Sequence, residues 1–110
     1  MKTTKQLFAL IFNRLSKDGE LFPRYIGEFD GTISLPKGNY PPIYSWTDTS
    51  TPPEVRGLVL SFNTPMLEEL CFQEAKKADI AIDPETTREA LALLMDLSRV
   101  AFQKMIESEG

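Results

Sequence analysis

The central segment of the chain, residues 35–53, most constrains the fold because it holds five of the eight prolines in a sequence of 110 residues. Proline fixes φ and lacks a backbone donor, so a helix cannot continue through this segment. The same segment contains the only tryptophan and two of the three tyrosines. Large amphipathic aromatics beside rigid turns offer apolar area together with hydrogen-bonding tips. We therefore expect strand ends and stiff loops here, and a first candidate for a contact surface.

Helices are expected on both sides of this segment. Apolar residues at helical spacing predict a helix over residues 3–17, with Gly19 as its stop signal. Asn63 and Asp83 each stand shortly before a proline, which is the pattern of a capping side chain followed by a first-turn proline. The pattern predicts two more helices, over residues 64–79 and 83–107.

Four strands are expected between these helices, over residues 25–29, 32–35, 43–46 and 55–62. The pair Asp30-Gly31 favours a hairpin between the first two strands. Because the connections are short, the four strands most simply form an antiparallel meander. The sequence therefore predicts one α+β domain over residues 1–110. It is a two-layer fold of order α-β-β-β-β-α-α, in which a four-stranded, mainly antiparallel sheet is packed by the N-terminal helix and the two C-terminal helices.

The composition excludes several kinds of chemistry. The chain has no histidine and one cysteine, Cys71. Histidine-dependent nucleophiles, histidine-ligated zinc and clusters of thiolate ligands are thereby removed. Glycine-rich nucleotide-binding motifs are also absent from the sequence. We expect no catalytic residue, no cofactor and no metal, and an inert, buried thiol at Cys71.

Charge is unevenly distributed along the chain, whose net charge is −4. Residues 63–110 carry ten acidic and five basic side chains, whereas residues 1–24 carry five basic and two acidic ones. This distribution argues against nucleic-acid binding and favours a protein partner with a basic surface. The start of the chain has no signal-peptide pattern, and no apolar run is long enough to span a bilayer. With a single cysteine, the sequence predicts a cytoplasmic protein that does not bind membranes.

The function expected from these features is that of a small acidic protein-binding module. It would act by association or occlusion, as an inhibitor, an immunity-type protein, a chaperone or an adaptor. Aromatic side chains would anchor the contact and acids would pair with basic groups of the partner. The candidate partner-binding residues are Tyr40, Tyr44, Trp46, Asp48 and Glu54. The competing interpretation is that Tyr44 or Trp46 faces the core and that the prolines only protect a sheet edge.

Two alternative functions remain open at this point. A small-ligand binder or a carboxylate-based enzyme would need a pocket between sheet and helices, lined by Arg24, Tyr25, Glu28 and Arg56. A structural subunit would instead form a homodimer or larger homo-oligomer through the last helix, which is long and apolar on more than one side.

Overall fold

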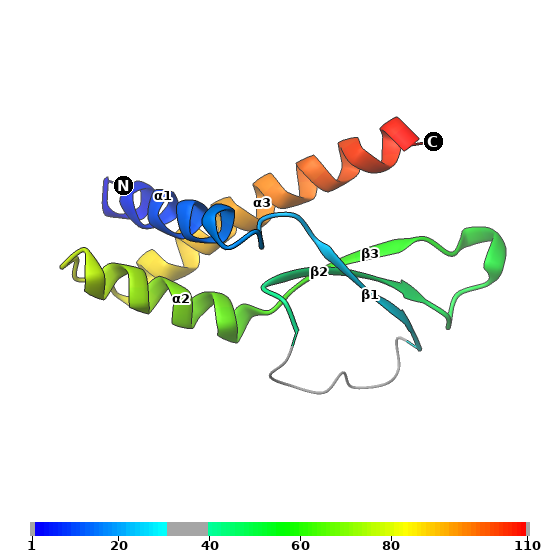
Figure 1. The fold of residues 1–110 in the computed structure, drawn as a ribbon, viewed down its shortest axis with the longest axis horizontal. Coiled ribbons are helices and arrows are strands. Elements are labelled where there is room, and N and C mark those ends of the chain that lie inside the picture. The colour runs from blue at the N-terminus through cyan, green and yellow to red at the C-terminus, as the bar shows by residue number, and fades with distance from the viewer. Residues whose placement is uncertain (1, 31–39, 110) are drawn as a thin grey trace.

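The computed structural model describes residues 2–30 and 40–109, which form three α-helices, three strands and one short 3₁₀ helix (Figure 1). The elements in chain order are α1 (Lys2–Lys17), β1 (Arg24–Phe29), β2 (Ile43–Asp48), η1 (Pro53–Val55), β3 (Leu58–Phe62), α2 (Thr64–Lys77) and α3 (Pro84–Glu109). The predicted α+β class is confirmed. The strand expected over residues 32–35 lies outside the described residues.

The sheet is mixed, with β2 in the centre. β2 runs parallel to β1 and antiparallel to β3. The prediction of four mainly antiparallel strands is therefore wrong. Parallel neighbours need a connection of about a dozen residues or more, and the thirteen residues between Phe29 and Ile43 are enough for the chain to return to the other end of the sheet.

A bulge interrupts the edge strand β1. The register of β1 against β2 shifts between Tyr25 and Glu28, and Gly27 in this interval has φ 116°. Residues other than glycine rarely adopt such a φ. The glycine at position 27 therefore explains why the bulge is located here. The pairing of β2 with β3 continues without a shift from Ile43 to Thr47.

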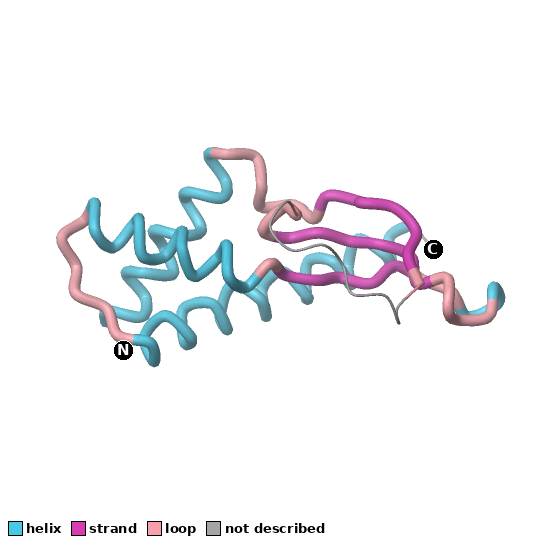
Figure 2. The backbone as a smooth tube through the Cα atoms, turned by 90° about the horizontal axis from the view of Figure 1, so that it is seen from below, coloured by secondary structure: helices cyan, strands magenta, loops and turns pink. Residues whose placement is uncertain are grey.

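The hydrophobic core lies mainly among the three helices. Its fully buried side chains include Leu7 and Ile11 of α1, Leu67 of α2, Leu94 of α3 and, from the sheet, Ile43. Figures 1 and 2 show the helices gathered at one end of the molecule and the sheet at the other, with the second half of α3 continuing over the sheet. The radius of gyration is 15.4 Å, whereas a compact chain of this length has about 13 Å. The protein is therefore elongated.

The helix ends follow the predicted signals. Gly19, at φ 71°, ends α1 in a Schellman motif in which Glu20 N–H donates to Leu15 O. Asn63 caps α2 through a bond from Met66 N, and Asp83 caps α3 through a 2.7 Å bond from Thr86 N.

Candidate functional site

Two of the three aromatic residues predicted to bind a partner, Tyr44 and Trp46, lie in the central strand of the sheet, and Tyr40 precedes it. Tyr44 and Trp46 are two residues apart on β2, so both side chains project from one face. Tyr44 is only 8% exposed, and its ring stacks on Tyr40 with 5.1 Å between the centroids. Trp46 is half-buried, and its Nε1 donates to Ser61 Oγ over 2.9 Å. The expectation that one of the two rings faces the core and the other faces solvent is therefore not met. Both rings lie on the same face of the sheet, and the Ile43 side chain lies on the other face.

The ionisation of Tyr44 reflects this structural environment. Burial raises the pKa of the Tyr44 hydroxyl, and the neighbouring Tyr40 adds to the shift, while a hydrogen bond with Ser61 acts in the opposite direction. At neutral pH the hydroxyl is protonated. The side chain therefore presents little area and no charge to a partner.

The two predicted acids lie at and beyond the other end of β2, which ends at Asp48. Asp48 Oδ1 accepts from Ser50 N over 2.9 Å and from Ser50 Oγ over 2.6 Å, so its carboxylate shapes the turn after the strand. Glu54 is exposed on η1. Because six strand residues span about 20 Å, these acids are far from Tyr40, which precedes β2. The five predicted residues are not brought into one patch.

Arg24, Tyr25 and Arg56, which were expected to line the alternative ligand pocket, instead contact different neighbours. Arg24 pairs with Glu20 over 2.8 Å, and the Tyr25 hydroxyl shares a 2.9 Å hydrogen bond with Thr47 Oγ1. The Arg56 guanidinium donates to the Thr51 carbonyl over 2.7 Å and thereby braces the loop before β3.

Of these residues, Arg24 lines a hollow of about 540 Å³ at the C-terminal end of α1, whose lining is partly charged and partly apolar. Arg14 in this hollow pairs with Asp18 over 2.7 Å and with Glu74 over 2.8 Å. Burial opposes the charge of Glu74, but hydrogen bonds from Arg14 and Lys77 outweigh burial and lower its pKa. The lowered pKa of Glu74 reflects its pair with Lys77 within α2 and its pair with Arg14, which joins α1 to α2.

Cys71 is fully buried in the core, as predicted. Burial, with a smaller contribution from Glu68, raises the pKa of its thiol from 9.0 to about 11. The thiol is protonated at neutral pH and is a poor nucleophile there.

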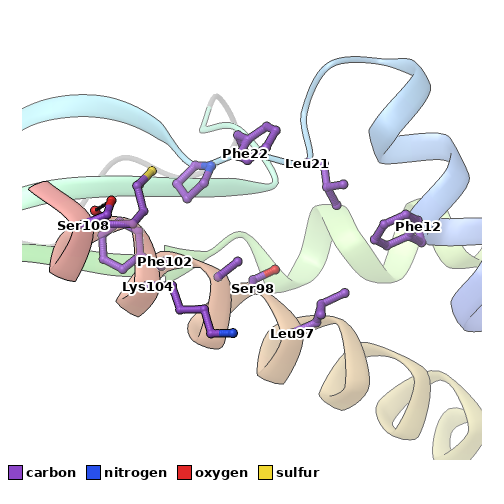
Figure 3. Close-up of a pocket in the computed structure, with 11 residues that line it drawn as sticks. Phe12, Leu21, Phe22, Leu97, Ser98, Phe102, Lys104 and Ser108 are labelled. Atoms are coloured by element: carbon purple, nitrogen blue, oxygen red, sulfur yellow. Dashed lines mark hydrogen bonds between the residues drawn. The ribbon is translucent and has the colours of Figure 1, made fainter.

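An apolar groove of about 530 Å³ lies between the C-terminal half of α3 and the segment that joins α1 to β1 (Figure 3). We call it the α3 groove. Its lining residues are Phe12, Leu21, Phe22, Pro23, Leu97, Ser98, Ala101, Phe102, Lys104, Met105 and Ser108. Lys104 is the one residue in this set with a charged side chain. Phe22 is 76% exposed and Leu97 is 45% exposed, so the groove presents apolar side chains to water.

The groove exists because α3 is longer than its neighbours. α3 has 26 residues, whereas α1 has 16 and ends at Lys17. The buried Leu94 lies on the face of α3 that packs in the helical core. Residues 98, 101, 105 and 108 continue this face at intervals of three or four residues, and all four line the groove. The groove is therefore the uncovered continuation of the core.

Sequence reasoning identified only part of this site. The breadth of the apolar surface on the last helix is visible in the sequence, and it led to the expectation of association through that helix. Phe22 was missed because an aromatic residue before Pro23 resembles any irregular strand entry. The signal that could have located the groove is the difference in length between the last helix and the first.

Comparison of the chain with protein-family models, with curated proteins and with solved structures found no match. Within residues 2–30 and 40–109, no helix is both long enough and apolar enough to cross a membrane. In the same described ranges, no three cysteine, aspartate or glutamate side chains come together as a potential metal site.

Proposed function

We propose that the protein binds another protein, and that the α3 groove receives an amphipathic helix of this partner. The observation that carries the proposal is the uncovered continuation of the core face of α3 from Ser98 to Ser108. Contiguous exposed apolar surface of this kind commonly marks an interaction site in soluble proteins.

A helix is the element that best fits the groove. Upstream of Leu94, the same face of α3 packs against α1. A partner helix that continues the direction of α1 beyond Gly19 would repeat this helix-on-helix contact. Apolar side chains at helical spacing on the partner would insert beside Ala101 and Met105, as amphipathic helices do in hydrophobic grooves.

The charges around the groove favour a partner helix with basic flanks. Glu107 lies on the exposed surface of the same helix, and residues 63–110 carry ten acidic and five basic side chains. Asp96 is already paired with Arg99, and Lys104 is the one charged residue in the groove lining. Opposite charge on the partner would steer its approach more than it would raise affinity. This supports the expectation of a partner with a basic surface.

Occlusion through Tyr40, Tyr44 and Trp46 has less support than docking on α3. Tyr44 is stacked and buried, and Trp46 is hydrogen-bonded to the neighbouring strand. Anchor residues at interfaces must present large apolar areas before the partner arrives. Phe22 and Leu97 meet that requirement.

The test is a comparison of two Ala→Asp variants in α3. Ala101 is exposed in the groove, and Ala92 is exposed on the same helix outside it. Wild-type protein and both variants are expressed with an affinity tag in the native cells, and stoichiometric partners are quantified. We expect Ala101→Asp to reduce partner recovery by about tenfold or more, since a carboxylate would be buried against apolar groups, and Ala92→Asp to have little effect.

Equal thermal unfolding of the two variants would show that any loss is not caused by misfolding. Retention of the partner by Ala101→Asp, or the absence of a stoichiometric partner of the wild type, would contradict the proposal.

A further inference from the structure

The two edges of the sheet differ in how they are protected from pairing with another strand. β1 has a bulge at Gly27 and carries Arg24 and Glu28, and bulges and charges are the usual protection of an edge. β3 has the sequence Leu-Val-Leu-Ser-Phe, with no charge, no proline and no register shift. The edge formed by β3 therefore has none of these protections, and β3 is the outer strand on its side of the sheet (Figure 2).

The register of β2 and β3 indicates which backbone groups point outward. Asn63 N–H donates to Pro42 O over 2.9 Å. Bonded pairs in an antiparallel ladder recur every second residue, so Val59 and Ser61 direct their backbone groups towards β2. Leu58, Leu60 and Phe62 therefore direct their N–H and C=O groups to the open edge. The backbone hydrogen bonds found outside the strands of the described residues do not engage these groups.

We propose that β3 pairs with the β3 strand of a second copy, antiparallel and about a two-fold axis at Leu60. Leu58 then lies opposite Phe62 of the other copy, and Leu60 lies opposite its own symmetry mate. Each of the three residues contributes one N–H and one C=O, which gives about six hydrogen bonds across the axis. The result is a continuous sheet of six strands.

A second copy suits this edge because the strand is complementary to itself. On the face towards α3, the pairing places Leu58, which is 43% exposed in one copy, against an aromatic ring. On the other face it places Val59 opposite Ser61. β3 has no charged side chain, so the two-fold axis brings no like charges opposite one another.

The cation that packs on the Phe62 ring of this strand is already neutralised. The Arg99 guanidinium lies 5.4 Å from the centroid of the Phe62 ring. Its Nη1 also donates to Asp96 Oδ1 over 3.0 Å. Bringing two copies together therefore places a neutral pair, and not an isolated cation, beside the new strand contact.

The pairing is tested first on the full wild-type chain, without any substitution. In a sample that mixes labelled and unlabelled protein, we expect an intermolecular nuclear Overhauser effect between Val59 Hα and Ser61 Hα. These residues form the closely spaced, non-hydrogen-bonded pair across the axis. We also expect the Leu58, Leu60 and Phe62 amides to exchange slowly, with protection that increases with protein concentration.

Substitutions then separate this contact from the α3 groove, with mass measured by sedimentation. Leu58→Pro removes an outward N–H at the first strand position, where proline is tolerated on an edge, and should weaken the dimer at least about tenfold. Val55→Lys alters an exposed apolar residue just before the strand and should leave the dimer intact, as should Ala101→Asp. A monomer at millimolar concentration with fast exchange at residues 58, 60 and 62 would overturn the inference. So would a dimer that lacks the Val59–Ser61 signal and dissociates in Ala101→Asp.

Discussion

Truncation of Tyr44 decides whether the aromatic segment is architectural or remains open to a partner. Tyr44 is 92% buried. A buried aromatic side chain of this size removes about 150–250 Å² of its surface from water. At about 25 cal/mol per Å² this corresponds to about 4–6 kcal/mol. The hydroxyl is polar and alanine keeps the Cβ, so we expect Tyr44→Ala to lower the free energy of unfolding by about 3 kcal/mol. A domain of this size has about 5–15 kcal/mol in total.

The stack with Tyr40 adds a second, independent quantity. Tyr40→Ala removes a half-buried ring and should cost about 1 kcal/mol. Stacked aromatic pairs contribute about 0.5–1.5 kcal/mol beyond their buried area. The double variant should therefore be more stable than the sum of the two single losses predicts, by about 1 kcal/mol.

The assay is urea unfolding at neutral pH, followed by the fluorescence of Trp46, the only tryptophan. Circular dichroism serves as the second probe because Trp46 lies on the same face of the sheet as Tyr44. Tyr25→Ala is the matched control, since Tyr25 is exposed on an edge strand, and it should cost less than about 1 kcal/mol. If Tyr44→Ala lowers the free energy of unfolding by less than Tyr25→Ala does, with an unchanged denaturant slope, the assignment of Tyr44 to the architecture of the sheet is refuted. The predicted contact surface at Tyr40, Tyr44 and Trp46 would then regain its support.

Three further predictions concern pH and helix ends. The pKa of the Cys71 thiol is raised from 9.0 in the unfolded chain to about 11 in the folded protein. The contribution of the protonated thiol to the free energy of unfolding is therefore complete below pH 9 and is lost as the pH rises towards 11. Cys71→Ala should flatten this alkaline decline, of order 2 kcal/mol, in urea denaturation measured at a series of pH values. The pKa of Glu74 is lowered, so its stabilisation is present at neutral pH and is lost below about pH 4.5; Glu74→Gln should cost about 1 kcal/mol at pH 7 and reduce the acid slope, and equal slopes in both proteins would contradict the role of its ion pair with Arg14. Gly19→Ala should cost about 1 kcal/mol because φ is 71°, whereas Asp79→Gly should add about 0.5 kcal/mol because it relieves a φ of 55° at the end of α2; thermal melts in which both changes have the same sign would refute this explanation.

The parts of the fold that sequence reasoning predicted are those set by local rules. The helix over residues 3–17 follows from apolar spacing, and its end follows from a glycine at a position that requires positive φ. The caps at Asn63 and Asp83 depend on side chains within three residues of the bonds that they accept. Such contacts form in the same way in any tertiary context, so the pattern alone identifies them.

The direction of the strands and the location of the site could not be predicted in this way. Whether β1 and β2 run parallel depends on where the chain travels between Phe29 and Ile43. The expected contact residues Tyr40 to Glu54 form a compact group in the sequence, but β2 separates its two ends by the length of a strand. Local spacing contains neither piece of information.

The sequence by itself determined the α+β class, the ends of the three helices and the buried thiol, because each of these depends on residue type and short-range spacing. It also shows that the chain has no histidine and a single cysteine for chemistry that needs those side chains. Only the tertiary structure decided which apolar surface remains uncovered. Both Leu94 and Met105 belong to one face of α3, but α1 ends at Lys17 and covers only the first of them. The difference between a core residue and a lining residue of the α3 groove is thus set by the length of a neighbouring helix, and not by the residue itself.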